Sequence, residues 1–189
     1  MASYAAADLR KGLRIELEGK PYLITEFNFV KPGKGASIYN CRLKNMFDGS
    51  TFMRAFRSND TMDIPDLEER RLRYSYAEGE DYVFLDENFE QVTVPGAVLG
   101  NARFFLYEDV EVSVLFYNRL PVEVTLPTFV EKEILETEPG ARGNTATNVL
   151  KPAKIAGGFE IPVPLFVNQG DIIKIDTRTG AYADRVLKR

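Results

Sequence analysis

Residues 13–35 read LRIELEGKPYLITEFNFVKPGKG, and this stretch decides the fold class. Apolar and polar side chains alternate along residues 13–17 and again along residues 23–29. Alternation is typical of a half-buried β-strand, because successive side chains of a strand point to opposite faces. Glu18-Gly19 supplies turn residues between the two runs. The stretch therefore predicts two antiparallel strands, and a second turn begins where it ends.

The same pattern recurs along most of the chain. Residues 72–76 and 110–116 alternate in the same way, and further turn residues stand at Asp48-Gly49, Glu78-Gly79 and Asn118-Arg119. Helical periodicity is almost absent, and the one candidate helix is a short stretch from Pro95 to Tyr107. We therefore predict an all-β protein.

Two polar or proline-bearing links divide the chain, at residues 60–66 and 126–127. They predict three units over residues 1–64, 65–127 and 128–189. Segments of this size can close only about five strands each, which indicates small β-barrels. Barrels of the SH3-like and OB kinds both often bind nucleic acid.

Composition argues against most enzyme classes and against metal sites. The chain has no histidine, and its single cysteine, Cys41, lies in an alternating run as a buried structural thiol would. Neither a phosphate-binding loop nor a dinucleotide fingerprint is present. The adjacent carboxylates at Glu68-Glu69, Glu80-Asp81 and Asp86-Glu87 are better explained as a solvated acidic face than as an acid/base pair. We expect a protein that is not an enzyme and holds no metal or cofactor.

The N-terminus, residues 1–11, lacks the apolar core of a signal peptide, and no run of about 18 apolar residues is present. We therefore expect a cytoplasmic protein. The formal charge of −4 is uneven, because residues 1–64 carry 10 basic and 7 acidic side chains, residues 65–127 carry 5 and 13, and residues 128–189 carry 9 and 8. The two end units could therefore face phosphate while the acidic middle unit faces solvent or a basic protein.

Two loops could carry function. In residues 30–37, VKPGKGAS, Pro32 fixes one backbone dihedral, and Gly33 and Gly35 permit positive φ on either side of Lys34. We expect Lys34 at the apex of a projecting hairpin, although these residues taken alone are more typical of a solvated hairpin lysine than of a functional one. Residues 137–148 form a polar, glycine-bearing loop that suits hydrogen bonding to RNA or an ordinary long connection. The basic side chains of the last unit favour a solvated surface, with phosphate contact as the alternative: Lys151, Lys154, Lys174, Arg178, Arg185, Lys188 and Arg189.

Taken in order along the whole chain, several strings resemble the bacterial elongation factor P family. They are residues 29–35 (FVKPGKG), 73–76 (RYSY), 126–130 (LPTFV), 137–143 (TEPGARG), 162–166 (PVPLF) and 176–180 (DTRTG). The resemblance implies an SH3-like (KOW-type) domain followed by two OB-fold domains in an L-shaped, tRNA-like arrangement. It implies a monomer that binds both ribosomal subunits between the peptidyl and exit sites and positions peptidyl-tRNA to relieve stalling at consecutive prolines.

The resemblance also implies roles for particular residues. Lys34 would be the functional tip of a loop that includes Lys31, Pro32, Gly33 and Gly35, and a modifying enzyme would extend it with a β-lysyl-type group. RNA contacts, including contact with the exit-site codon of the mRNA, would come from a set in the last unit: Arg142, Gly143, Asn144, Thr145, Tyr182 and Arg185. Asn144 stands where the family usually has Asp, and an amide keeps an acceptor while adding donors.

One departure from the family follows the tip, where residues 36–41 read ASIYNC in place of the usual Gln-Ala-Phe-x-Arg-Val pattern. Because the modifying enzyme reads this neighbourhood, β-lysylation, another modification and an unmodified Lys34 all stay open. Three other identities are the alternatives to this family. One is an elongation-factor-P-like paralogue, against which the lysine-bearing tip argues, and another is the archaeal and eukaryotic hypusine-bearing factor, which lacks a third barrel. The last is a scaffold that binds proteins through its acidic middle unit.

Overall fold

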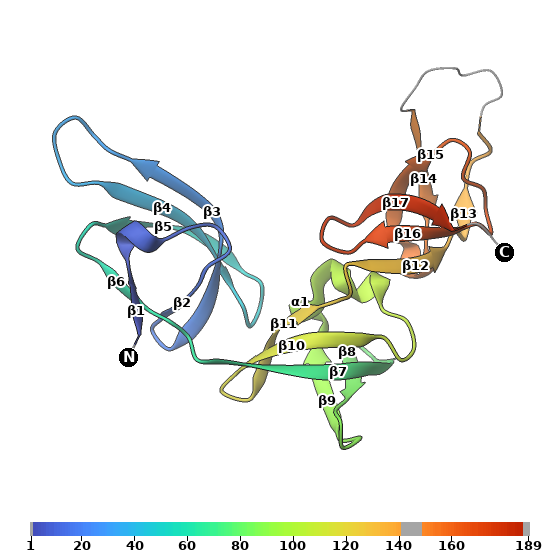
Figure 1. Ribbon diagram of the computed structural model, residues 1–189, viewed down its shortest axis with the longest axis horizontal. Helices are drawn as coiled ribbons and strands as arrows, with labels where there is room; N and C mark the ends of the chain where they lie inside the picture. Colours follow the sequence, from blue (N-terminus) through green and yellow to red (C-terminus); the bar gives the residue numbers. More distant parts are fainter. Residues whose placement is uncertain (1, 141–148, 187–189) are drawn as a thin grey trace.

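The computed structural model describes residues 2–140 and 149–186, and within these ranges most of the regular secondary structure is β-strand (Figure 1). All strand pairs are antiparallel and form four sheets. The predicted all-β class is confirmed. No helix in these two ranges is long and apolar enough to cross a membrane.

The N-terminal unit is one sheet with the strand order β1-β6-β2-β3-β4-β5. Its elements are β1 (Ser3–Ala5), the 3-10 helix η1 (Ala6–Asp8), β2 (Arg14–Leu17), β3 (Lys20–Val30), β4 (Ile38–Asn45), β5 (Thr51–Arg57) and β6 (Thr61–Asp63). The two alternating runs of the opening stretch become β2 and β3, which pair through the Glu18-Gly19 turn.

The middle unit is a five-stranded sheet with the order β11-β10-β7-β8-β9. Its elements are β7 (Leu67–Glu78), β8 (Asp81–Leu85), β9 (Gln91–Pro95), the helix α1 (Gly96–Leu99), the 3-10 helix η2 (Gly100–Phe105), β10 (Glu111–Tyr117) and β11 (Leu120–Thr125). The two helical turns lie inside the stretch predicted as the one candidate helix.

The C-terminal unit holds two three-stranded sheets, ordered β12-β16-β17 and β13-β14-β15. Its elements are β12 (Phe129–Glu133), β13 (Glu136–Thr137), β14 (Leu150–Lys154), the 3-10 helix η3 (Ala156–Gly158), β15 (Glu160–Pro164), β16 (Ile172–Asp176) and β17 (Ala181–Val186). Across the described residues, hydrogen bonds leave each of the four sheets open rather than closing it into a complete ring.

The hairpin turns adopt the backbone that their residues predicted. Glu18 and Gly19 have φ of 51° and 71°, and Asn118 and Arg119 have φ of 47° and 66°. Positive φ at both central residues matches the right-handed twist of the strands that the turn joins.

Buried side chains gather in three clusters. One fills the N-terminal unit and includes Ile15, Ile24 and Cys41, whose side chain is fully buried as predicted. A second runs without interruption through the middle and C-terminal units. The third is small and joins the N-terminal and middle units, with Met46, Tyr117 and Val122 as its buried members.

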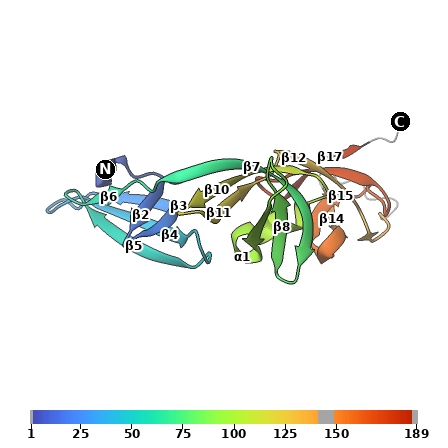
Figure 2. The same ribbon diagram turned by 90° about the horizontal axis from the view of Figure 1, so that it is seen from below.

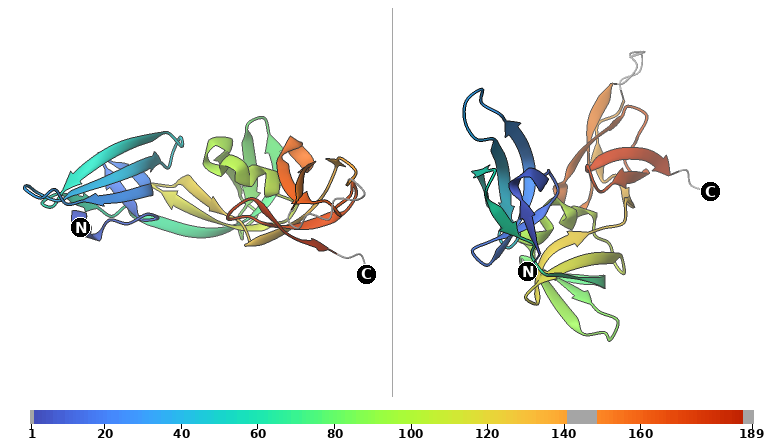
Figure 3. Two further views of the ribbon diagram at one scale, coloured as in Figure 1. Left: turned by 90° about the horizontal axis from the view of Figure 1, so that it is seen from above. Right: turned by 60° about the vertical axis from the view of Figure 1, so that its left-hand side comes forward.

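The three units form a bent chain of domains. The middle unit lies at the bend, with the N-terminal and C-terminal units at the two ends (Figure 1). Viewed from below, the molecule is long and flat, and β7 runs from the N-terminal unit into the middle one (Figure 2). Two further views show the same succession of units (Figure 3).

Candidate functional site

The hairpin of β3 and β4 is the most prominent projection of the N-terminal unit (Figure 1). Its two strands pair from Tyr22 opposite Asn45 to Val30 opposite Ile38, and a loop of residues 31–37 extends beyond the last pair. A register shift lies at Ile24/Glu26, near the middle of β3. The long ladder of backbone hydrogen bonds holds the loop away from the body of the sheet.

Aromatic side chains stiffen the hairpin just below its loop. The Tyr39 ring lies 5.0 Å from that of Phe29 and 6.4 Å from that of Phe27, measured between centroids. The Arg10 guanidinium lies 5.5 Å from the centroid of Phe27, so the hairpin also contacts the segment before β2. Such pairs each stabilise by about 0.5–1.5 kcal/mol beyond their burial, which favours one orientation of the loop.

Lys34 is exposed at the tip of this loop, as its flanking residues predicted. Gly35 has φ of +127°, a conformation that side-chain-bearing residues rarely adopt. Gly33, by contrast, does not use the positive φ that the sequence permits at both glycines. The reversal of the chain is concentrated on the far side of the lysine, and Pro32 approaches the position of a Gly35 Cβ at 3.8 Å.

The charge of the tip is purely positive. Residues 27–41 contain two lysines, Lys31 and Lys34, and no carboxylate. Both lysines are exposed, and neither forms an ion pair with another residue in the part of the chain that the structure describes. A projecting cation without an intramolecular partner is suited to meet an anion on another molecule, such as a phosphate of RNA.

The second predicted contact loop cannot be assessed in the same way. Arg142, Gly143, Asn144 and Thr145 lie outside the described residues. Their predicted RNA contacts stay predictions.

Tyr182 and Arg185, the other two predicted contact residues, lie on β17, opposite Ile175 and Ile173 of β16. The Tyr182 ring packs against the shared core, and burial raises the pKa of its phenol. Arg185 lies 3.7 Å from a carboxylate oxygen of Asp171 and stacks over Phe166 at 5.0 Å. Both side chains are partly buried and already have partners within the C-terminal unit, so the structure gives them an internal role in addition to any outward contact.

Among the basic side chains of the C-terminal unit that the structure describes, Lys151 departs from a solvated surface, whereas Lys154 and Arg178 are 44% and 69% exposed. Lys151 is 6% exposed and donates to the Glu138 carbonyl oxygen at 2.5 Å. Lys154 pairs with Glu136 at 3.0 Å, and Arg178 pairs with Asp176 at 2.7 Å. Lys188 and Arg189 lie outside the described residues.

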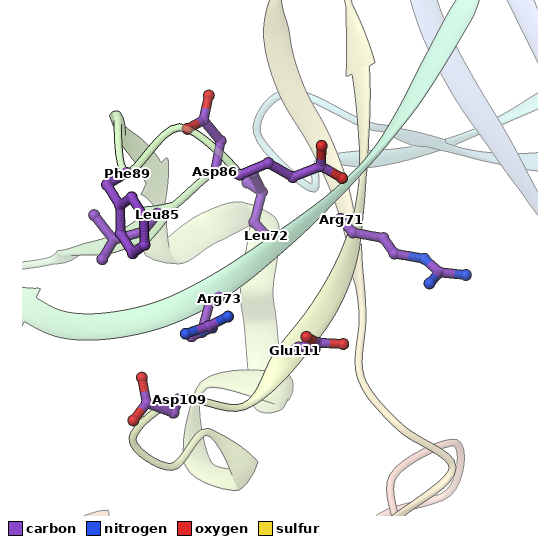
Figure 4. Close-up of a pocket in the computed structure, with 9 residues that line it drawn as sticks. Arg71, Leu72, Arg73, Leu85, Asp86, Phe89, Asp109 and Glu111 are labelled. Atoms are coloured by element: carbon purple, nitrogen blue, oxygen red, sulfur yellow. The ribbon is translucent and has the colours of Figure 1, made fainter.

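A pocket in the middle unit is lined by both arginines and carboxylates (Figure 4). It has a volume of about 330 Å³ and lies where β7, the β8–β9 turn and the start of β10 meet. The Asp86 carboxylate accepts from the backbone N–H groups of Asn88 and Glu90 at 2.8 and 2.9 Å, so it is occupied in closing that turn. Phe89, beside it, is 75% exposed. Within residues 2–140 and 149–186, no cluster of three His, Cys, Asp or Glu side chains could hold a metal.

Contacts between the N-terminal and middle units lie near the start of β3, and no sequence pattern predicts them. Arg14 of β2 forms a two-pronged ion pair with Glu123 of β11, with Nε–Oε2 at 3.0 Å and Nη2–Oε1 at 2.5 Å. The Tyr117 hydroxyl donates to the Gly19 carbonyl oxygen at 3.2 Å. These residues are about a hundred positions apart, so only the tertiary structure brings them together.

Three family models together match most of the chain. They are described as the elongation factor P KOW-like domain over residues 5–62, the elongation factor P OB domain over residues 67–124, and elongation factor P, C-terminal, over residues 122–185. These matches agree with the predicted SH3-like and OB folds.

Similar proteins and structures carry related names. Elongation factor P of Desulfotalea psychrophila is 43% identical over 96% of this chain and 98% of its own, and that of Syntrophus aciditrophicus is 45% identical over 97% and 98%. A solved structure, eukaryotic translation initiation factor 5A from Methanococcus jannaschii, superposes with a TM-score of 0.54 at 16% identity. It covers 66% of this chain and 92% of its own, which shows a likeness of fold.

Proposed function

The chain belongs to the elongation factor P family of translation factors, and on that basis we propose that it binds the ribosome between the peptidyl and exit sites and positions peptidyl-tRNA. Its effect would be to stimulate peptide-bond formation and relieve stalling at consecutive prolines. As a monomer in the cytoplasm it would contact both ribosomal subunits, the tRNA and the exit-site codon of the mRNA.

The observation that carries the proposal is the exposed Lys34 at the tip of the β3–β4 hairpin. The strands hold it away from the N-terminal sheet, and no carboxylate stands within residues 27–41 to neutralise it. A narrow projecting loop can follow the path of an RNA end into a cleft, and its cation can meet the phosphates there.

The proposed contribution is orientation rather than chemistry. Holding two reactants in a near-attack geometry can lower a barrier by about 7–11 kcal/mol without proton transfer by the positioning group. The ribosome then remains the catalyst, and the protein acts as a brace on the tRNA. Prolyl nitrogen is a constrained and poor nucleophile, so its reaction gains most from correct placement.

We also propose that Lys34 carries a covalent β-lysyl-type extension made by a modifying enzyme. The exposed side chain is open to such an enzyme, and a longer arm with an added amine would reach further along the tRNA end. Intact-mass measurement of protein from its native host tests this directly. An unchanged mass would contradict the extension, and a different added mass would identify another modification.

RNA contact by the C-terminal unit is part of the same proposal. Arg142, Gly143, Asn144 and Thr145 would face the exit-site codon, while Tyr182 and Arg185 would support contacts with the small subunit. The partners already made by Arg185 indicate that it would orient this surface as well as touch RNA.

Ribosomes translating a message with three consecutive prolines provide the functional test. We expect the purified protein to raise the rate of peptide-bond formation at these codons and to leave a message without prolines nearly unchanged. Lys34→Ala should abolish most of the stimulation while the thermal unfolding curve stays the same, because the side chain is exposed.

Lys11→Ala is the matched control, since Lys11 is an exposed lysine in a turn of the same unit and lies outside the tip loop of residues 31–37. It should retain full stimulation. A Lys34→Ala variant as active as wild type would remove the tip from the proposal, and a wild-type protein without effect on either message would overturn the function itself.

A further inference from the structure

The two junctions of the molecule are built differently. The middle and C-terminal units share one continuous buried core, in which Phe105 of η2 packs edge-on against Phe159 at 5.3 Å and Lys132 donates to the Leu106 carbonyl oxygen. The N-terminal and middle units meet instead at a separate, smaller cluster, in which four partly buried apolar side chains pack around the buried Met46, Tyr117 and Val122. So small a cluster can be perturbed without disrupting the core of either unit.

A few polar contacts complete the smaller junction. The Arg14–Glu123 pair is two-pronged and its side chains are only 34% and 26% exposed. A bidentate arginine–carboxylate pair fixes direction as well as distance, because the guanidinium is planar. The Tyr117 hydroxyl donates to the Gly19 carbonyl oxygen, and the Phe47 ring packs edge-on against Tyr117 at 5.9 Å.

These contacts lie at one end of β3, and the tip loop lies at the other. Gly19 immediately precedes β3 (Lys20–Val30), whose 11 residues lead directly into the loop that carries Lys34. At ~3.3 Å per residue, the strand is a lever of roughly 35 Å, so a tilt of about 5° at the junction would move the tip by about 3 Å. A displacement of about 1 Å at a reacting centre can already cost about a hundredfold in rate.

Resting on the proposed function, we propose that Arg14, Glu123 and Tyr117 form an interdomain clasp that sets the angle of the β3–β4 hairpin and thereby positions Lys34 on the peptidyl-tRNA. The three residues act through the tip and make no contact with the substrate themselves. The middle and C-terminal units are held together by their shared core. The clasp fixes the orientation of the N-terminal sheet relative to these two units.

A charge swap tests the clasp in the triproline assay. Arg14→Glu places two carboxylates against each other and should lower the maximal stimulated rate at saturating protein by about tenfold, since misplacement affects the reaction step more than binding. The concentration for half-maximal effect should change less than the rate. The double variant Arg14→Glu/Glu123→Arg restores an opposite pair and should recover at least about half of the lost rate.

Two further variants separate positioning from loss of fold. Arg70→Glu breaks the exposed Arg70–Glu68 pair within β7, at 2.8 Å, and should leave the stimulation unchanged. Tyr117→Phe removes only the hydroxyl that reaches Gly19 and should lower the maximal rate by a smaller factor, with an unchanged unfolding curve.

Spin labels measure the angle without reference to activity. Ser58 in the N-terminal unit and Asn88 in the middle unit are both exposed, so the labels are attached to the variants Ser58→Cys and Asn88→Cys. Cys41 is buried and should stay unlabelled. The distance distribution between the labels should broaden in Arg14→Glu and narrow again in the double variant.

The outcomes distinguish the two proposals. An inactive wild-type protein would overturn the proposed function and the clasp's role with it. An active wild type that loses stimulation in Lys34→Ala but keeps it in Arg14→Glu would overturn the clasp alone. An Arg14→Glu variant that loses rate without any recovery in the double variant, or with an unchanged label distance, would equally overturn it.

Discussion

Gly35 is the residue with the most unusual backbone conformation in the loop that carries Lys34. Its φ of +127° reverses the chain directly after Lys34, whereas Gly33 on the other side adopts an ordinary conformation. An L-residue in the Gly35 conformation would meet strain of about 1–3 kcal/mol. The two glycines look equivalent in the sequence, but only Gly35 has a backbone conformation that requires glycine.

This difference can be tested by paired substitutions. Gly35→Ala should alter the loop and lower the stimulated rate at proline codons, because the strain is relieved by moving Lys34. Gly33→Ala should leave the rate within about twofold, since its new Cβ meets no atom within 4 Å and its backbone is not left-handed. The stimulated rates of both variants are measured in the triproline assay. Equal losses of rate would contradict the different backbone roles of Gly33 and Gly35.

Cys41 illustrates a residue whose role is packing. Burial raises the pKa of its thiol above the usual 9.0, so the reactive thiolate is rare at neutral pH and is populated only at higher pH than in the unfolded chain. We expect a thiol reagent at pH 8 to label it at least about tenfold more slowly in the native protein than in denaturant. Equal labelling rates in the two conditions would show that the site is open.

At the scale of elements, the hairpin turns set the register of the sheets. The β10–β11 turn places Asn118 and Arg119 at positive φ, and Arg119 is a long side chain in a conformation that favours glycine. The pairing of β10 with β11 shows a register shift at Leu115/Phe116, a few residues before this turn. The turn is therefore held by the pairing of its strands against a local preference of one residue.

Relief of this local strain should stabilise the protein. Arg119→Gly should raise the free energy of unfolding by about 0.5 kcal/mol, because glycine tolerates positive φ and the gain exceeds its extra unfolded-state entropy. Arg71→Gly, within β7, should instead lower the free energy of unfolding by about 1 kcal/mol. In a strand interior, glycine gains nothing from access to positive φ and costs more conformational entropy on folding. Urea titrations of the two variants measure both signs, and destabilisation by Arg119→Gly would contradict the argument.

At the scale of the whole molecule, the two junctions predict two unfolding units. The middle and C-terminal units share a core and should unfold together, while the N-terminal unit has its own core and should unfold separately. Calorimetry should therefore show two transitions. A single transition for the wild-type protein would mean that the smaller junction couples all three units.

A core variant identifies which transition belongs to which unit. Phe159→Ala removes a ring that stacks on Phe104 at 5.0 Å and packs edge-on against Phe105 at 5.3 Å across the larger junction. It should destabilise the shared transition by about 2 kcal/mol and leave the N-terminal one in place. A shift of both transitions by the same amount would contradict their independence.

The sequence by itself determined the strands, the turns and the exposed lysine, because alternation and turn residues act over a few positions and need no distant partner. It also carried the family through motifs in order along the chain. It could not predict which tip glycine is left-handed, that Lys151 is buried, or that Arg14 meets Glu123. The Gly35 backbone depends on the detailed path of the loop, and the burial of Lys151 and the Arg14–Glu123 pair depend on packing. Packing brings together residues whose positions in the sequence do not indicate that they touch. The orientation of the Lys34 hairpin therefore belongs to the tertiary structure, while the presence of the hairpin belongs to the sequence.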